Sequence, residues 1–176
     1  MNIPLVITFV GADRAGLVSA VSDAVAAHGG TWLESRLARL AGQFAGVVRA
    51  DAPEAEAEAL ERALAALPGL KLTVTRGGAT EPGKQRLRLE LVGLDRPGIV
   101  RDATRALAAL GVNIAEFASD LRPAPFSGVP LFYAKAVLEA PETVAPEAVR
   151  QALEALAGEL TAELPENAGL TLADSD

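Results

Sequence analysis

The sequence predicts an α+β protein made of two similar modules, each with the element order βαββαβ. One observation is an internal repeat: residues 11–18 and 93–100 are identical at five of eight positions, with a shift of 82 that holds without a gap through residues 34 and 116. A second is the alternation of short apolar stretches with amphipathic helical stretches in each half. A repeat of roughly 80 residues is a duplicated small domain, not a solenoid unit. This element order is that of the ferredoxin-like fold, in which two helices cover one face of an antiparallel four-stranded sheet.

In the first half, each element follows from an apolar pattern and the turn residues that bound it. The predicted strands are residues 3–10, 31–40, 44–50 and 70–75, and the predicted helices are residues 15–28 and the stretch after Pro53. The first strand is rich in β-branched residues, and the first helix carries one apolar face with Gly29-Gly30 at its end. Residues 41–43 form the turn of a hairpin, and Pro68-Gly69 ends the second helix.

The second half repeats this order after a linker at residues 76–84 that contains three glycines and a proline. Its predicted strands are residues 86–91, 112–121, 131–138 and either 161–164 or 170–172; its predicted helices are 97–110 and 146–160, and 173–176 are expected to be disordered. We therefore place the two domains at residues 1–77 and 85–172. The hairpin connection at residues 122–130 is about six residues longer than its counterpart and is interpreted as a surface insertion.

Composition excludes several classes of function. The net charge is −7; residues 1–78 carry 7 basic and 8 acidic side chains and the remainder carries 9 and 15, so a direct nucleic-acid contact is not expected. With no cysteine and one histidine, neither a thiolate metal site nor a cofactor is expected. The N-terminus lacks signal-peptide features and no stretch is long enough to span a bilayer, which indicates a cytoplasmic protein without a membrane partner. Small modules with alanine-rich cores favour a homo-oligomer.

The repeated motif Gly-x-Asp-Arg-x-Gly is the candidate ligand site, because it lies where the first strand of each module meets its first helix. Its members are Gly11, Asp13, Arg14 and Gly16 in the first copy and Gly93, Asp95, Arg96 and Gly98 in the second. Glycines let the chain turn tightly and expose backbone amides at a helix N-terminus, where a carboxylate binds, and an adjacent Asp can receive an ammonium group. This combination suits a free amino acid. The competing interpretation is a turn in which Asp13 and Asp95 cap the helices.

The second copy, Asp-Arg-Pro-Gly-Ile-Val followed by a helix and Gly-Val-Asn-Ile (residues 111–114), resembles the signature of ACT domains, which are amino-acid-sensing regulatory modules. The run from Glu34 to Phe44 resembles tandem-ACT proteins of the glycine cleavage system transcriptional repressor family. The resemblance implies an effector held at the interface of two modules. It is contacted by the loop after the first strand and by an Asn at the start of the second strand. Asp95 and Asn113 occupy these positions in the second module; the first module has Asp13 and Thr31, with Ala15 in place of proline.

The resemblance implies a non-enzymatic, amino-acid-sensing regulator that acts through a partner regulator protein, with glycine as the first choice of effector. A regulatory subunit of an amino-acid biosynthetic enzyme is the alternative. An enzyme using Asp13 or Asp95 as a general base is disfavoured, because no second acid, nucleophile or metal set accompanies either residue.

Overall fold

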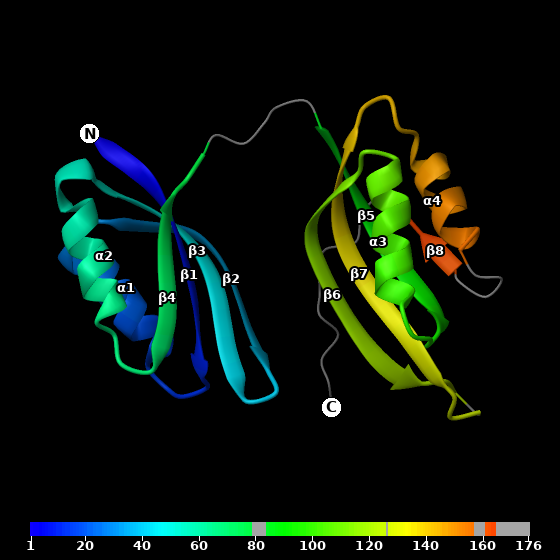
Figure 1. Cartoon of the computed structure of the whole chain (residues 1–176), viewed down its shortest axis with the longest axis horizontal. Helices are drawn as coiled ribbons and strands as arrows, with labels where there is room; N and C mark the ends of the chain where they lie inside the picture. Colours follow the sequence, from blue (N-terminus) through cyan, green and yellow to red (C-terminus); the bar gives the residue numbers. More distant parts are fainter. Residues whose placement is uncertain (79–83, 126, 157–160, 165–176) are drawn as a thin grey trace. The chain divides into compact units, whose positions relative to one another are not determined.

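The computed structural model describes residues 1–78, 84–125, 127–156 and 161–164, and the chain divides into two compact units, Met1–Thr80 and Glu81–Asp176 (Figure 1). Each unit is a βαββαβ module with its own four-stranded antiparallel sheet. The predicted α+β, ferredoxin-like fold is therefore confirmed. None of the helices in the described residues is long and apolar enough to cross a membrane.

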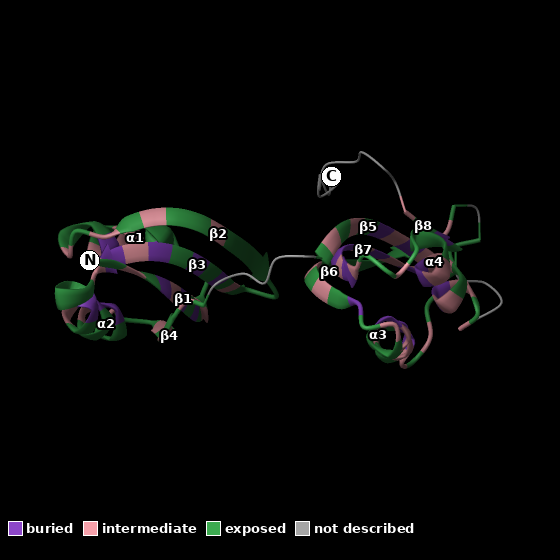
Figure 2. Ribbon diagram, turned by 90° about the horizontal axis from the view of Figure 1, so that it is seen from above, coloured by how far each residue is buried: buried purple, intermediate pink, exposed green. Residues whose placement is uncertain are grey.

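The first unit has the strand order β2-β3-β1-β4. Its elements are β1 (Asn2–Ala12), α1 (Leu17–Ala27), β2 (Thr31–Leu40), β3 (Gln43–Pro53), the 3-10 turn η1 (Glu54–Glu56), α2 (Ala57–Ala65) and β4 (Leu70–Arg76). Both helices lie on one face of the sheet (Figures 1 and 2), and alternate residues of β1 are buried in the core between the sheet and the helices. Leu5, Ile7 and Phe9 are at most 4% exposed, and they pack with Val21, Val25, Leu60 and Leu64 of the helices.

The second unit has the equivalent order β6-β7-β5-β8. Its elements are β5 (Lys84–Leu94), α3 (Ile99–Ala109), β6 (Asn113–Pro123), β7 (Pro130–Pro141), α4 (Pro146–Glu154) and β8 (Thr161–Glu163). A separate core joins Leu89 and Leu91 of β5 to Leu107 of α3 and Leu153 of α4. The two cores share no residue.

The repeat extends to backbone detail. The bounds of β5 and α3 are those of β1 and α1 shifted by 82, and a β-bulge interrupts the same place in both modules, between Trp32 and Glu34 and between Ile114 and Glu116. Gly16 and Gly98 precede their helices with φ values of 87° and 85°, a left-handed conformation that favours glycine. The duplication therefore preserves the strand-to-helix turn itself.

The two modules differ most in their hairpins. Ile7 pairs with Val48, whereas the equivalent Leu89 pairs with Ala136, which confirms an insertion of six residues in the second hairpin. The short connection is a two-residue turn in which Ala41 and Gly42 both have positive φ, as tight hairpins require. In the second module the ladder ends at the pair Pro123 and Pro130, and the Ala124 amide donates one further hydrogen bond to the Val129 carbonyl at 2.8 Å within the connection.

Several predicted element ends were wrong. The helix predicted from Pro97 begins at Ile99, because Gly98 takes the left-handed conformation and is the N-cap residue. Strands β3 and β7 run on to prolines 53 and 141, beyond the predicted ends at 50 and 138, because these prolines still lie opposite Asn2 of β1 and Lys84 of β5. Of the two positions offered for the last strand, residues 161–163 form it. The predictions for 157–160, 170–172 and 173–176 lie outside the described residues.

Candidate functional site

The candidate site consists of the two strand-to-helix loops, residues 13–16 between β1 and α1 and residues 95–98 between β5 and α3. In each loop the backbone N–H of the aspartate donates to a carbonyl at the start of the second hairpin strand or the turn before it: Asp13 to Gly42 at 2.9 Å, and Asp95 to Pro130 at 3.2 Å. The loops are therefore fixed to their own hairpins. What differs between them is what the charged side chains contact.

Gly11 allows β1 to pack closely against the turn that precedes β4. It pairs with Leu70 of β4, and a Cβ atom built on it would come within 2.3 Å of the Gly69 carbonyl oxygen. The equivalent Gly93 is buried within β5, where it pairs with Phe132. The first glycine of the motif thus allows close packing in the first module, and in the second it is a buried residue of a central strand.

In the first loop, both charged side chains contact the protein itself. The Asp13 carboxylate accepts a hydrogen bond from Arg39 of β2 at 3.4 Å. The Arg14 guanidinium donates to the Pro68 carbonyl at 2.9 Å, which ties the loop to the turn between α2 and β4. Both residues are exposed, and each has one contact within its own module.

In the second loop, Arg96 is occupied but Asp95 is exposed and has no side-chain partner among the described residues. Arg96 donates to the Asp102 carboxylate at 2.7 Å, and Arg101 donates to the other oxygen of the same group at 3.0 Å. The guanidiniums of Arg96 and Arg101 hold the pKa of Asp102 below its ordinary value. The loop therefore presents one uncommitted carboxylate beside a cluster of two arginines and one aspartate.

The expectation that Asp13 and Asp95 cap their helices was wrong. The N-cap positions are Gly16 and Gly98, and neither α1 nor α3 has a side-chain hydrogen bond at its cap. The first backbone bond of α3 runs from the Asp102 amide to the Gly98 carbonyl at 2.9 Å, so the Val100 and Arg101 amides precede it at the helix terminus. Such amides can donate to an anion.

Asn113 does not lie beside Asp95 in its own module. Asn113 and Arg86 both pair with Glu139 of β7, so Asn113 is level with the start of β5, whereas Asp95 follows the end of that strand. Nine residues of extended chain separate these levels, which is roughly 30 Å. Thr31 is likewise level with Pro4, far from Asp13. One module therefore cannot present both groups to one small molecule.

Sequence reasoning missed Asp102, which accepts a hydrogen bond from Arg96, and Arg101, which donates to the same carboxylate. Their signal was present: an acidic residue in the first turn of α3 that is replaced by Ala20 in the first repeat. The Pro68 contact of Arg14 could not be found in this way, because it uses a backbone carbonyl 54 residues away.

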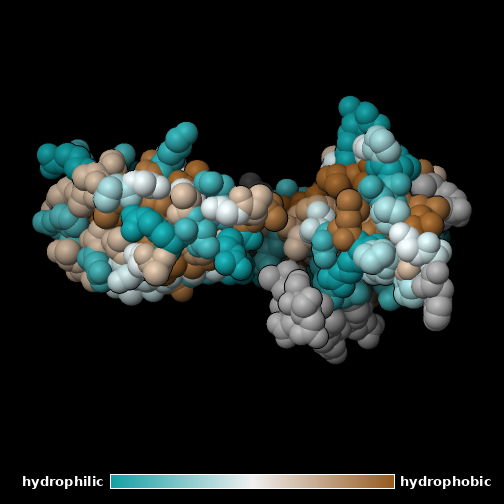
Figure 3. Space-filling model, turned by 90° about the horizontal axis from the view of Figure 1, so that it is seen from below, coloured by the Kyte–Doolittle hydropathy of each residue, from teal (hydrophilic) through white to brown (hydrophobic). Residues whose placement is uncertain are grey.

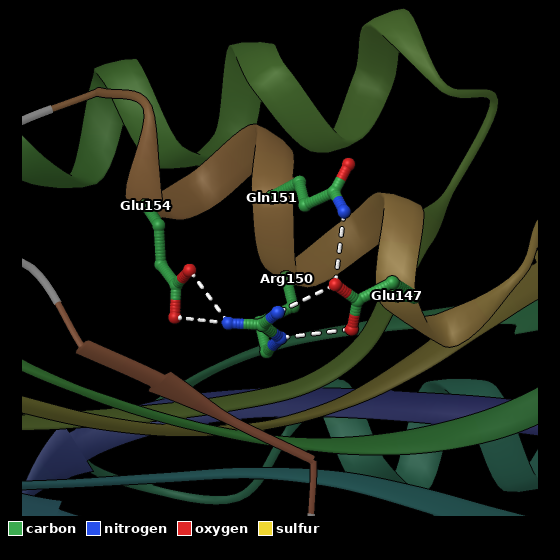
Figure 4. Close-up of polar contacts among 4 residues, drawn as sticks. All are labelled: Glu147, Arg150, Gln151 and Glu154. Atoms are coloured by element: carbon green, nitrogen blue, oxygen red, sulfur yellow. Dashed lines mark hydrogen bonds and ion pairs between the residues drawn. The ribbon is translucent and has the colours of Figure 1, made fainter.

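The other charged clusters are structural. In α4, Arg150 contacts Glu147 and Glu154 on successive turns, and Gln151 also donates to Glu147 (Figure 4). The hydrogen bond from Arg150, supported by that from Gln151, lowers the pKa of Glu147. The described residues contain no group of three or more acidic or histidine side chains arranged to hold a metal. The lone His28 caps the C-terminus of α1, and its Nδ1 lies 3.1 Å from Glu56.

Known proteins support this architecture. Residues 4–74 match the family model described as ACT domain. A crystal structure of an unknown protein from Galdieria sulphuraria is 29% identical with a TM-score of 0.83, covering 96% of this chain and 100% of that one. No curated protein matches this sequence.

A second solved structure, described as a putative glycine cleavage system transcriptional repressor, is 18% identical with a TM-score of 0.70. It covers 95% of this chain and 99% of that one, and at this identity the likeness concerns the fold. Residues 4–74 thus match the ACT domain, the second unit repeats the element order and strand order of the first, and the chain as a whole is similar in fold to these two structures.

Proposed function

We propose that this protein is a non-enzymatic cytoplasmic regulator that binds a small amino acid at the loop between β5 and α3 and acts on a partner regulator protein. The observation that carries the proposal is the exposed carboxylate of Asp95, uncommitted among the described residues, next to a helix terminus with no side-chain cap. An α-amino acid carries an ammonium and a carboxylate on neighbouring atoms. Asp95 supplies a partner for the first, and the terminal amides of α3 supply partners for the second.

The loop between β5 and α3 is supported as a site by its own rigidity. Arg96 and Arg101 both donate hydrogen bonds to the Asp102 carboxylate. The loop residue Arg96, before Gly98, is therefore linked to the first turn of α3, after Gly98, by charged hydrogen bonds. A preorganised loop loses little conformational freedom when a ligand binds. The first loop is assigned a structural role, because Arg39 and Pro68 already hold its Asp13 and Arg14.

Asn113 and Asp95 of the same module lie too far apart to contact one small effector. Asn113 is an exposed residue at the start of β6, and the length of the module separates it from Asp95. If Asn113 contacts the effector, it does so from a different module than the Asp95 that holds the ammonium group. The same applies to Thr31.

Glycine is the first choice of effector. The fold likeness to a protein described as a glycine cleavage system repressor supports that choice, and the ligand groups assigned above contact only the ammonium and carboxylate that glycine has. Regulation then requires that the effector favour one state of the protein through a difference in affinity between two states. The acidic charge balance supports action through a partner protein rather than on DNA.

Isothermal titration calorimetry of the full chain with each of the twenty amino acids tests the sensing part. We expect saturable binding of one or a few small amino acids, and no binding by any of them at millimolar concentration would contradict the proposal. Affinity capture from the source cell, with and without the effector, tests the partner. Recovery of a transcription regulator supports the proposal, whereas recovery of a biosynthetic enzyme alone would favour a regulatory subunit instead.

A further inference from the structure

The guanidinium of Arg101 lies against the N-terminal end of helix α3. A Cβ atom built on Gly98, the N-cap residue, would come within 2.9 Å of Nη2 of Arg101, whereas nothing lies within 4 Å of the same position on Gly16. Figure 3 views the second unit from the end at which β5 meets α3, and hydrophilic side chains reach the surface there among hydrophobic ones. Arg101 is therefore next to the amides to which the effector carboxylate is assigned above.

Asp102 fixes this guanidinium without using all of its donors. Nε and Nη2 of Arg101 both lie 3.0 Å from Oδ1 of Asp102, and Oδ2 of the same carboxylate accepts a hydrogen bond from Arg96. Nη1 of Arg101 has no partner among the described residues, and the side chain is 62% exposed. Arg101 is thus held in place with N–H groups left to donate to a ligand.

The loop between β5 and α3 carries one uncommitted charge of each sign. Asp102 neutralises one of the two arginines, Arg96 and Arg101, which leaves an excess of one positive charge at the start of α3. A cation is unfavourable at the N-terminal end of a helix, which is itself positive, whereas an anion is stabilised there. Asp95 supplies the uncommitted negative charge. Together they match a zwitterion, whose ammonium and carboxylate groups carry one charge each.

The first module shows that the fold does not require this cation. Ser19 and Ala20 occupy the positions in α1 that Arg101 and Asp102 occupy in α3. The same strand-to-helix turn forms there, with its N-cap glycine in the same left-handed conformation. The arginine and its aspartate are therefore features of the second loop and not of the turn.

We propose that Arg101 is the specificity-determining residue of the effector site. Its guanidinium donates to the effector carboxylate and so selects α-amino acids over amines that lack this negative charge. Asp102 is a positioning residue, because it acts only through the guanidinium that it holds. This inference rests on the proposed function, since it concerns the same loop.

Calorimetric titration of the full chain with glycine and with glycinamide tests this role. Glycinamide keeps the ammonium group and a carbonyl oxygen but has no negative charge. At slightly acid pH, where both amines are protonated, we expect the wild type to bind glycine roughly tenfold more tightly than glycinamide. Arg101→Gln should weaken glycine binding roughly tenfold and leave glycinamide binding almost unchanged, so that the ratio of the two affinities falls toward one.

Arg105→Gln provides the matched control, because it removes the same charge from an exposed position of the same helix. It should leave both affinities within about twofold, since exposed charges are screened by water and salt. A purely structural role of Arg101 would weaken both ligands equally, so the ratio of the two affinities separates that role from a direct contact. Urea denaturation checks that the variants fold.

The wild type separates failure of the effector assignment from failure of the Arg101 assignment. If the wild type binds no glycine, the effector assigned under the proposed function is wrong and the role of Arg101 falls with it. If the wild type binds glycine but Arg101→Gln keeps the wild-type ratio of affinities, the role of Arg101 is overturned and the proposed function stands. Equal affinity of the wild type for glycine and glycinamide would overturn it as well.

Discussion

Asp13 and Asp95 occupy the same position in two copies of one motif, yet their side chains have different surroundings. Both are exposed, but the first contacts Arg39, whereas the second has no side-chain partner among the described residues. The sequence already favoured the second copy through Pro97 and Asn113, but not for this reason. The decisive partners lie on other elements, so spacing within the motif could not reveal them.

At Gly11, a single methyl group should be destabilising. Gly11→Ala would set a Cβ within 2.3 Å of the Gly69 carbonyl oxygen, which is backbone and cannot move aside without disturbing β4. We expect a loss of about 1–3 kcal/mol in the free energy of unfolding, measured by urea denaturation. Gly78→Ala is the control, because nothing lies within 4 Å of its Cβ position; equal stabilities of the two variants would contradict this role for Gly11.

Among the elements, prediction from sequence worked best where a local pattern decides the structure. Helices α1 and α3 both carry an apolar face and end before a glycine with positive φ, and both were predicted within two residues of their bounds. The ends of β3 and β7 were predicted too short, because the ladder with β1 or β5 keeps a strand extended where its own pattern has stopped. Long-range pairing is not visible in local sequence.

Helix α4 gives a test of charge at the scale of one element. Arg150→Gln removes the contacts to Glu147 and Glu154 (Figure 4) and should lower the midpoint of urea denaturation at neutral pH. Because Arg150 lowers the pKa of Glu147 in the folded state, this stabilisation is fully present above the ordinary value of 4.5 and is lost as the pH falls through the lowered value. The difference between wild type and variant should therefore shrink in acid and in high salt.

Arg105→Gln, in α3, is the control for Arg150→Gln. Arg105 is an exposed arginine of α3 with no ion pair in the described structure. Its replacement should leave the midpoint unchanged at every pH. A difference for Arg150→Gln that does not shrink as the pH falls through the lowered pKa of Glu147 would show that the arginine acts through packing rather than charge.

At the scale of the whole molecule, the two units are separately stabilised. Their hydrophobic cores have no residue in common, and each sheet is complete within its own unit. The internal repeat predicted this duplication, because the same pattern of apolar residues and turn glycines specifies the same module twice. It did not predict which module would keep an open site, since that depends on contacts unique to each copy.

A chain truncated after Gly78 should therefore fold by itself. It retains β1 to β4, both helices and the complete first core. We expect a dispersed proton–nitrogen NMR spectrum and a cooperative denaturant transition, although a domain of this size has a small margin of stability. A collapsed spectrum typical of an unfolded chain would show that the first unit needs the second.

The central claim is that Asp95, and not Asp13, receives the ammonium group of an amino-acid effector. Calorimetric titration of glycine into the wild type, Asp95→Asn and Asp13→Asn tests it most directly. A lost hydrogen bond between charged groups costs about 1.5–3 kcal/mol, so Asp95→Asn should weaken binding roughly 10- to 100-fold. Asp13→Asn should bind as the wild type does. Unchanged affinity in Asp95→Asn, or an equal loss in both variants, would contradict this account.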